Sequence, residues 1–292
     1  MTHSPTDAFE AFAIRVVADS APIAMTQSLG TRILDHRGLV DLPALLVLVD
    51  DLGGVPFALA DRSSSSLQAR LTMSMGARPD RGDVLRGDSE LEMFDDALGS
   101  TTVRVVRDDE VVVRGQARSV RVGRTVIGES GVVVGEPLPA PDEAEPPPTI
   151  DPTLSGAAVI ASIADGTLRI GPLAELLNAT IIDPDPTALR LAVETSRWMG
   201  NFFGTMHGGI ISTIAAQAAS LGIQANMPTG HDYQLIEFTI AFLRSPAVDG
   251  QRVTATVNPV KIGRRLSTVD VLLQDAEGTL VARATADARC DL

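Results

Sequence analysis

A motif of five residues near position 200 has the types and the spacing to assist chemistry at a carbonyl group. It reads N-x-x-G-x-x-H-G-G from Asn201 to Gly209 and stands directly before a predicted helix, Ile210 to Gly222. Two glycines at a helix start let another molecule approach the backbone closely, and the N–H groups of the first turn point outward without partners. Because the helix dipole is positive at this end, these donors can stabilise negative charge that builds on a carbonyl oxygen.

The same residues allow a simpler interpretation. For the three residues from His207 to Gly209 alone, a glycine turn with a capping histidine would be the better explanation. The asparagine six residues before the histidine and the apolar helix that follows favour the functional interpretation.

Periodicity indicates the elements that must position this motif. The stretch 159–178 has a loose helical pattern, and 208–223 is typical of a buried helix of small apolar residues. Alternating apolar residues predict strands at Leu189 to Val193, Leu235 to Leu243, Arg252 to Pro259, Ser267 to Asp275 and Thr279 to Arg289. The motif is therefore the loop that enters an apolar helix, which three or four strands follow.

The chain divides into two halves. Prolines and acids crowd together without periodicity at residues 135–152, which predicts an extended linker between an N-terminal unit, 1–134, and a C-terminal unit, 153–292. At an offset of 166 to 168 residues the two units align in three segments: Thr72 to Met75 on Thr239 to Phe242, Pro79 on Pro246, and Ser100 to Asp108 on Ser267 to Asp275. Any two half-buried antiparallel sheets resemble each other by alternation, but the preserved spacing favours a true repeat.

The stretch from about Leu189 to Ala288 resembles the hotdog thioesterases of the phenylacetate-pathway (PaaI-like) type. The motif of that family is an Asn, a Gly, then His-Gly-Gly and a carboxylate nine residues after the His. Residues 237–246, 261–267 and 275–282 look like its central strand, its Gly-Arg turn and its last hairpin. The resemblance implies an α+β fold of two tandem hotdog units, each an antiparallel sheet wrapped around a central helix.

The resemblance also implies a reaction, the hydrolysis of an acyl-CoA or aryl-CoA thioester to the free acid and CoA. In the family the first Gly after the His, here Gly208, donates the oxyanion contact. The Asn, here Asn201, helps to position the thioester or water, and the carboxylate acts as general base or nucleophile.

That carboxylate is missing from the second half, where Ala216 stands nine residues after the histidine. Hotdog thioesterases build each site between two units, with the glycine donor from one and the carboxylate from the other. At an offset of 166 residues Ala216 falls on Asp50 of the first half. We therefore predict one composite site, which joins Asp50 to three residues of the second half: Asn201, His207 and Gly208.

Asp50 stands in the strongly apolar stretch 42–52, where an acid buried without partners costs several kcal/mol to ionise, so a functional role would explain it. The alternative is an exposed pair, Asp50 and Asp51, that ends a helix before Gly53. A slip of one residue in the alignment would select Asp51 as the acid and pair it with Gln217.

The mirror-related site is predicted to be inactive. At the same offset His207 falls on Asp41 and Asn201 on Asp35, so the first half lacks the His-Gly-Gly. The mirror site would hold Asp35 and Asp41 together with Ala216.

Four further residues are candidates for substrate binding: Gly209, Arg244, Arg264 and Arg265. The arginines lie on segments that resemble the coenzyme A contacts of the family, and arginine suits phosphate groups. Solvated edge charges are the alternative interpretation of each. The serines at 63–66 precede a strand where some relatives place a substrate-contacting serine, but four consecutive serines are more typical of a loop.

Composition argues against other classes of function. A net charge of −13 disfavours a nucleic-acid partner. No run of about 18 apolar residues is present, and residues 1–10 lack a basic flank, so we expect a soluble cytoplasmic protein without a membrane partner. The single cysteine, Cys290, excludes an internal disulfide, and no zinc spacing exists, so neither a metal nor a cofactor is expected.

Two alternatives to hydrolysis share the fold. A non-catalytic acyl-CoA-binding protein, a sensor or carrier, would need the same pocket but not the acid. A hydratase or dehydratase is disfavoured because no Asp and His pair of that type is spaced along a loop and helix. Fused chains of this kind are expected to form homo-oligomers, because relatives do.

Overall fold

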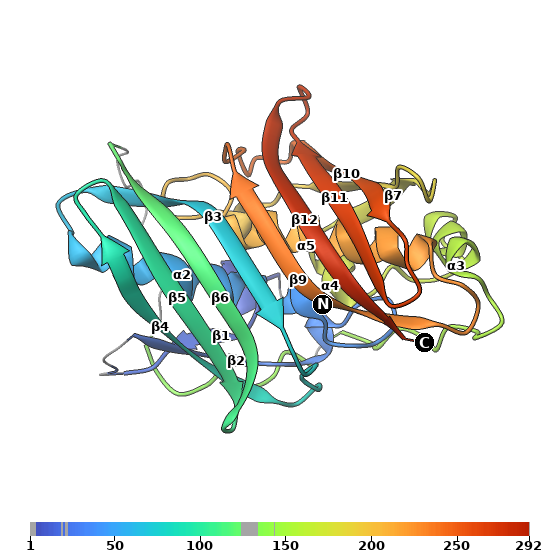
Figure 1. Cartoon of the computed structure of the whole chain (residues 1–292), viewed down its shortest axis with the longest axis horizontal. Helices are drawn as coiled ribbons and strands as arrows, with labels where there is room; N and C mark the ends of the chain where they lie inside the picture. Colours follow the sequence, from blue (N-terminus) through green and yellow to red (C-terminus); the bar gives the residue numbers. More distant parts are fainter. Residues whose placement is uncertain (1–3, 19, 21–22, 124–133, 143, 292) are drawn as a thin grey trace.

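The structure is a computed structural model that describes residues 4–18, 20, 23–123, 134–142 and 144–291. Some of the stretches interpreted above therefore lie partly outside the described residues: the first three positions of the chain, 124–133 of the predicted N-terminal unit, and residue 143 of the predicted linker. Figure 1 shows one broad antiparallel sheet with two long helices, α2 and α5, on the same face.

The two halves contain similar sets of elements. The first comprises α1 (Ala8–Ala11), β1 (Ile14–Val16), β2 (Ala24–Ser28), the 3-10 helices η1 (Thr31–Ile33) and η2 (Leu42–Leu45), α2 (Leu46–Ala60), β3 (Ser65–Met75), β4 (Val84–Phe94), β5 (Leu98–Arg107) and β6 (Glu110–Val122). The second comprises α3 (Gly156–Ala164), α4 (Pro172–Leu176), β7 (Ala179–Asp183), β8 (Arg190–Glu194), the 3-10 helix η3 (Arg197–Met199), α5 (Gly208–Ala225), β9 (Asp232–Phe242), β10 (Arg252–Lys261), β11 (Leu266–Gln274) and β12 (Leu280–Asp291).

Within the described residues each half contributes six strands, and the two sheets join into one. The strand order is β1-β2-β4-β5-β6-β3-β9-β12-β11-β10-β8-β7, so β3 and β9 form the seam between the halves. In this antiparallel pair Thr72 lies opposite Thr239, the residue with which the repeat aligns it. The predicted α+β fold of two tandem hotdog units is confirmed, and the seam places an approximate two-fold axis near these two threonines.

The two central helices, α2 and α5, lie in the core of the protein. In α5 nearly every residue is buried, as its small apolar composition predicts. In α2 the side chains of Leu52, Phe57 and Val49 pack directly against glycines of the facing strands β4, β5 and β6. Within the described part of the chain, Leu42–Ala60 alone is apolar and long enough to cross a membrane, and 67% of its apolar window is buried inside the protein. It is a core helix here.

Two helix predictions differ from the structure. The stretch 159–178 forms two short helices, α3 and α4, because Gly166 and Gly171 adopt positive φ angles of 82° and 96° between them. Conversely, α2 does not end before Gly53 but continues to Ala60, since the glycine allows close packing on Ala117 of β6.

Residues 135–152 run along the first half. The N–H of Gly135 donates to the Val16 carbonyl at 3.1 Å, and the Arg32 N–H donates to the Pro141 carbonyl at 3.0 Å. The described residues of this stretch contain no helix or extended strand. The Arg169 guanidinium of the second half donates to the Glu145 carbonyl at 3.0 Å, so the stretch is bonded to both halves that it connects.

Candidate active site

The loop 201–207 is shaped by its own asparagine. The Asn201 Oδ1 accepts hydrogen bonds from the N–H groups of Phe203, at 2.9 Å, and Thr205, at 3.3 Å. Gly204 between them has a φ of 74°, which glycine adopts without strain. The side-chain amide of Asn201 thus contributes to the site by folding the loop that delivers His207 to the start of α5.

The first turn of α5 presents a free donor. His207 is the N-cap, and its Nδ1 accepts the Gly209 N–H at 3.0 Å. Among the described residues the Gly208 N–H has no acceptor, as expected for a first helical position. This N–H lines a cavity, so it can meet the oxygen of a bound molecule.

Asp50 approaches Gly208 from the other half. It sits in the second turn of α2, is 5% exposed, and lies so close to Gly208 that a Cβ there would be 2.8 and 2.9 Å from its two carboxylate oxygens. Its Oδ1 has no hydrogen-bond partner among the described residues. The structure thus brings together the residues that the sequence pairs across about 150 positions. Ala216 and Gln217 are buried in α5 and do not line this cavity.

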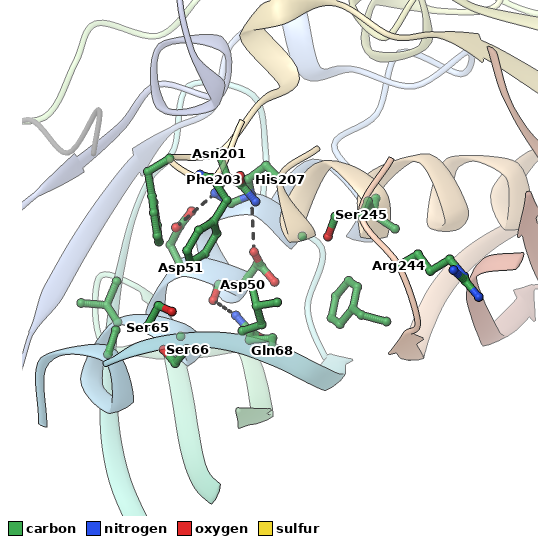
Figure 2. Close-up of a pocket in the computed structure, with 18 of the residues that line it drawn as sticks. Asp50, Asp51, Ser65, Ser66, Gln68, Asn201, Phe203, His207, Arg244 and Ser245 are labelled. Atoms are coloured by element: carbon green, nitrogen blue, oxygen red, sulfur yellow. Dashed lines mark hydrogen bonds and ion pairs between the residues drawn. The ribbon is translucent and has the colours of Figure 1, made fainter. Parts of the chain in front are cut away.

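His207 contacts both acids of α2. Its Nδ1 lies 3.4 Å from Asp50 Oδ2, and its Nε2 lies 3.3 Å from Asp51 Oδ1. Figure 2 shows the two carboxylates directed toward the imidazole. Asp51, considered from the sequence as an alternative acid, is therefore a neighbour of the histidine on the opposite side from Asp50.

The pKa values of this group follow from burial and charge. Burial raises the pKa of Asp50 to about 7, with a further increase from Asp51, although His207 and the Gly209 N–H oppose the change. Burial alone would lower the pKa of His207, but the carboxylates of Asp51 and Asp50 outweigh it and raise that pKa to about 9. Near neutral pH the imidazole therefore favours its charged form.

The cavity in front of these groups has a volume of about 390 Å³ and is lined by both halves. Its floor holds Asp50, Asp51 and Gln68, whose side-chain amide donates to the Asp50 backbone carbonyl. Its walls include three phenylalanines, two arginines and four serines: Phe202, Phe203, Phe242, Arg62, Arg244, Ser64, Ser65, Ser66 and Ser245. The sequence interpretation missed Arg62 and set the serines at 63–66 aside, although their position before a strand was the available signal.

The four predicted substrate-binding residues do not lie together around the cavity. Arg244 lines the cavity, and Figure 2 shows its guanidinium directed away from the carboxylates. Gly209 does not line it, because its N–H bonds to His207 and its Cα faces Val47 of α2.

Arg264 and Arg265 lie at the opposite end of the sheet from the cavity. They occupy the turn before β11. That strand begins at Leu266, which lies opposite Arg289 of β12, close to the level of Tyr233 in β9. The cavity lies at the other end, where Phe242 pairs with Ala282. In β11 the two levels are those of Leu266 and Leu273, which are about 23 Å apart at roughly 3.3 Å per residue.

The mirror-related position is filled by a buried ion network. Arg37 donates to the carboxylates of Asp35, at 2.6 Å, and Asp41, at 2.7 Å. The same guanidinium stacks on the ring of Tyr233, 3.8 Å from its centroid, and donates to the Tyr233 carbonyl. At the offset of 167 residues, Tyr233 stands where the first half has the cavity-lining Ser66. A large side chain therefore stands at the position of Ser66, and the cavity of about 360 Å³ beside Arg37 is lined by neither Asp35 nor Asp41.

Comparisons with known proteins agree with this fold. The profile described as "Thioesterase superfamily" matches residues 203–282. A Deinococcus radiodurans protein named "Putative esterase" is 32% identical over 106 residues, which cover 36% of this chain and 68% of that protein.

Solved structures match the whole chain. A protein of unknown function with a hot dog fold from Alicyclobacillus acidocaldarius has a TM-score of 0.63 and 12% identity, covering 100% of this chain and 99% of that one. A structure described as a "putative thioesterase II" from Thermobifida fusca has a TM-score of 0.61 and 14% identity, covering 99% of both. These likenesses show the fold, and the sequence matches show that the chain belongs to the thioesterase superfamily.

Proposed function

We propose that this protein hydrolyses acyl-CoA or aryl-CoA thioesters at one composite site between its two halves. The observation that carries the proposal is the contact of the Asp50 carboxylate with Gly208 at the start of α5. It sets an acid from one half beside a free N–H donor from the other, inside a cavity. This arrangement matches what thioester hydrolysis needs, namely a base and an oxyanion donor on one carbonyl group.

In the proposed reaction the thioester oxygen accepts the Gly208 N–H. Asp50 takes a proton from a water molecule, and the water oxygen forms a bond to the carbonyl carbon. The carbon–sulfur bond then breaks, and the leaving thiolate takes up the proton that Asp50 accepted. A pKa of about 7 for Asp50 suits a general base at neutral pH.

The substrate assignment rests on the cavity. The phenylalanines on its walls fit an acyl or aryl group. Arg62 and Arg244 are arginines that line the cavity, and we assign the phosphate groups of coenzyme A to them in place of Arg264 and Arg265, which lie at the far end of the sheet.

We further propose that the chain is of the PaaI-like type, with tandem hotdog units at 1–134 and 153–292 joined by the segment 135–152. The motif from Asn201 to Gly209 supports this assignment. A homo-oligomeric state and a cytoplasmic location stay predictions.

The test is the release of free thiol from a panel of acyl-CoA and aryl-CoA thioesters. Asp50→Asn keeps the shape of the side chain but removes the base, so kcat should fall about a hundredfold or more. Asp96→Asn, an exposed acid on the β4–β5 turn, is the control and should retain full activity.

Two outcomes would contradict the proposal. A loss of less than about tenfold in Asp50→Asn would exclude Asp50 as the base. Tight binding of acyl-CoA by the wild type without thiol release would identify a non-catalytic acyl-CoA-binding protein instead.

Single turnover in water labelled with oxygen-18 separates the two possible roles of the acid. Under the general-base reaction the label enters the released acid directly. Label on the Asp50 carboxylate, detected by mass spectrometry of its peptide, would show that Asp50 attacks the thioester itself.

A further inference from the structure

The imidazole of His207 is held at both of its nitrogens. Nδ1 accepts the Gly209 N–H, and Nε2 lies 3.3 Å from Asp51 Oδ1. A ring nitrogen that accepts a hydrogen bond carries no proton, so in the neutral ring the proton is on Nε2 and is donated to Asp51. Asp51 therefore selects the tautomer of the histidine.

Nδ1 has a second neighbour that needs the opposite arrangement. Asp50 Oδ2 lies 3.4 Å from it, and an ionised carboxylate beside an unprotonated nitrogen would be two acceptors facing each other. With the neutral ring, Asp50 must therefore hold the proton. With the charged ring, Nδ1–H faces Asp50, which is then a carboxylate.

The Gly209 N–H has an acceptor in both arrangements. It donates to Nδ1 when the ring is neutral, and it lies close enough to Asp50 to lower the pKa of that acid by hydrogen bonding. When Nδ1 gains the proton, this N–H can instead donate to the newly ionised Asp50. Transfer of the proton thus leaves no buried donor without a partner.

Asp51 decides which arrangement prevails. The charged groups that face His207 are Asp50 and Asp51 of α2 and, more weakly, Asp7 before α1. Asp51 lies on the Nε2 side, so its charge stabilises the imidazolium while Asp50 remains on the Nδ1 side for the reaction. The second oxygen of Asp51 has no other partner in the described residues.

We propose that Asp51 is a positioning residue for the reaction proposed above: it holds Nε2–H of His207, so that Nδ1 takes the proton of Asp50 and leaves Asp50 ionised. One proton moves from Asp50 Oδ2 to Nδ1, and the net charge of the three side chains is unchanged. The inference rests on the proposed function for its role, but the hydrogen-bond geometry stands independently of it.

The first experiment needs no substrate. Nitrogen-15 NMR of the His207 ring, assigned with a His207→Gln variant, reports both its pKa and its tautomer. The wild-type ring should be charged at neutral pH. In Asp51→Asn its pKa should fall by about three units, so that the ring is mostly neutral at pH 7, and in Asp51→Glu it should stay high. Asp109→Asn, on the exposed β5–β6 turn, is the matched control.

The second experiment is kinetic. Asp51→Asn should lower kcat about tenfold while KM changes less than about threefold, and Asp51→Glu should restore most of kcat. Unfolding transitions of the variants, measured by circular dichroism, identify any loss that comes from the fold alone.

The outcomes separate this inference from the function. An unchanged His207 pKa in Asp51→Asn, or an unchanged kcat, would overturn the role of Asp51 even in an active enzyme. A wild type that releases no thiol would overturn the proposed function, while the NMR comparison would still decide whether Asp51 controls the histidine.

Discussion

At the scale of single residues, the close approach of Asp50 to Gly208 makes the glycine indispensable. A methyl group at position 208 would lie 2.8 and 2.9 Å from the two Asp50 oxygens, so Gly208→Ala must displace the carboxylate. We predict at least about a hundredfold loss of kcat in thiol release, with the fold retained. Gly76→Ala, where an added Cβ meets no atom within 4 Å, should keep full activity. Equal activity in both variants would mean that Asp50 does not act at this contact.

The pH dependence follows from the same acid. Asp50 acts as a base only when ionised, and burial raises its pKa to about 7. The value of kcat/KM should therefore fall as pH decreases through about 7 and be nearly lost at pH 5. Initial rates between pH 5 and 8 on one acyl-CoA test this. A rate that stays constant down to pH 5 would point to a base with an ordinary carboxylate pKa.

The sequence could identify some of these residues and not others. The repeat predicted Asp50, because homologous positions of two similar units face each other across their interface. The contact of Asp51 with His207 depends on the direction of a side chain on a helix packed against another helix, which alignment does not contain. The role of Asn201 in folding its own loop was hidden for the same reason.

At the scale of elements, glycines of the sheet determine how closely α2 approaches it. A Cβ at Gly115 of β6 would lie 2.9 Å from Val49 and 3.3 Å from the backbone oxygen of Thr72. Gly115→Ala should therefore lower the free energy of unfolding by about 1–3 kcal/mol, since overpacking forces shifts in a filled core. Urea denaturation measures the loss. Gly123→Ala, where an added Cβ meets nothing within 4 Å, should leave stability within about 0.5 kcal/mol of the wild type.

Element boundaries show where local pattern competes with packing. Five strands of the second half, β8 to β12, were predicted closely, because alternation along a half-buried sheet is a strong signal, whereas the short strand β7 was missed. The end of α2 was not, since Gly53 and Gly54 favour a helix stop in isolation. Close contact with β6 keeps the helix intact through both of them to Ala60.

At the scale of the whole molecule, the two-fold relation of the halves explains why Arg264 and Arg265 lie far from the cavity. The resemblance to the family assigns the turn of Arg264 and Arg265 to the same site as the glycine motif, because both belong to the second half. The axis near Thr72 and Thr239, however, places the site at the start of β3 and the end of β9. Each site therefore takes its loop from one half, and the strand that begins beside that loop comes from the other half. The turn before β11 therefore serves the mirror-related position.

That mirror-related position decides how many ligands one chain can bind. There Tyr233 is buried, and Arg37 joins it to the carboxylates of Asp35 and Asp41. The cavity of about 360 Å³ that Arg37 lines has no counterpart of Asp50, of Gly208 or of the phenylalanines among the described residues of its lining. Removing Arg37 would leave two buried carboxylates without their closest cation, which opposes opening the site.

A non-hydrolysable thioether analogue of an acyl-CoA should therefore bind with a stoichiometry of one per chain in isothermal titration calorimetry. The Arg62→Ala, Arg244→Ala double variant should weaken this binding without changing the stoichiometry, since both arginines line the cavity at Asp50 and Gly208. Two equivalents per chain would show that the Arg37 network yields to ligand and that the second half of the repeat still forms a site.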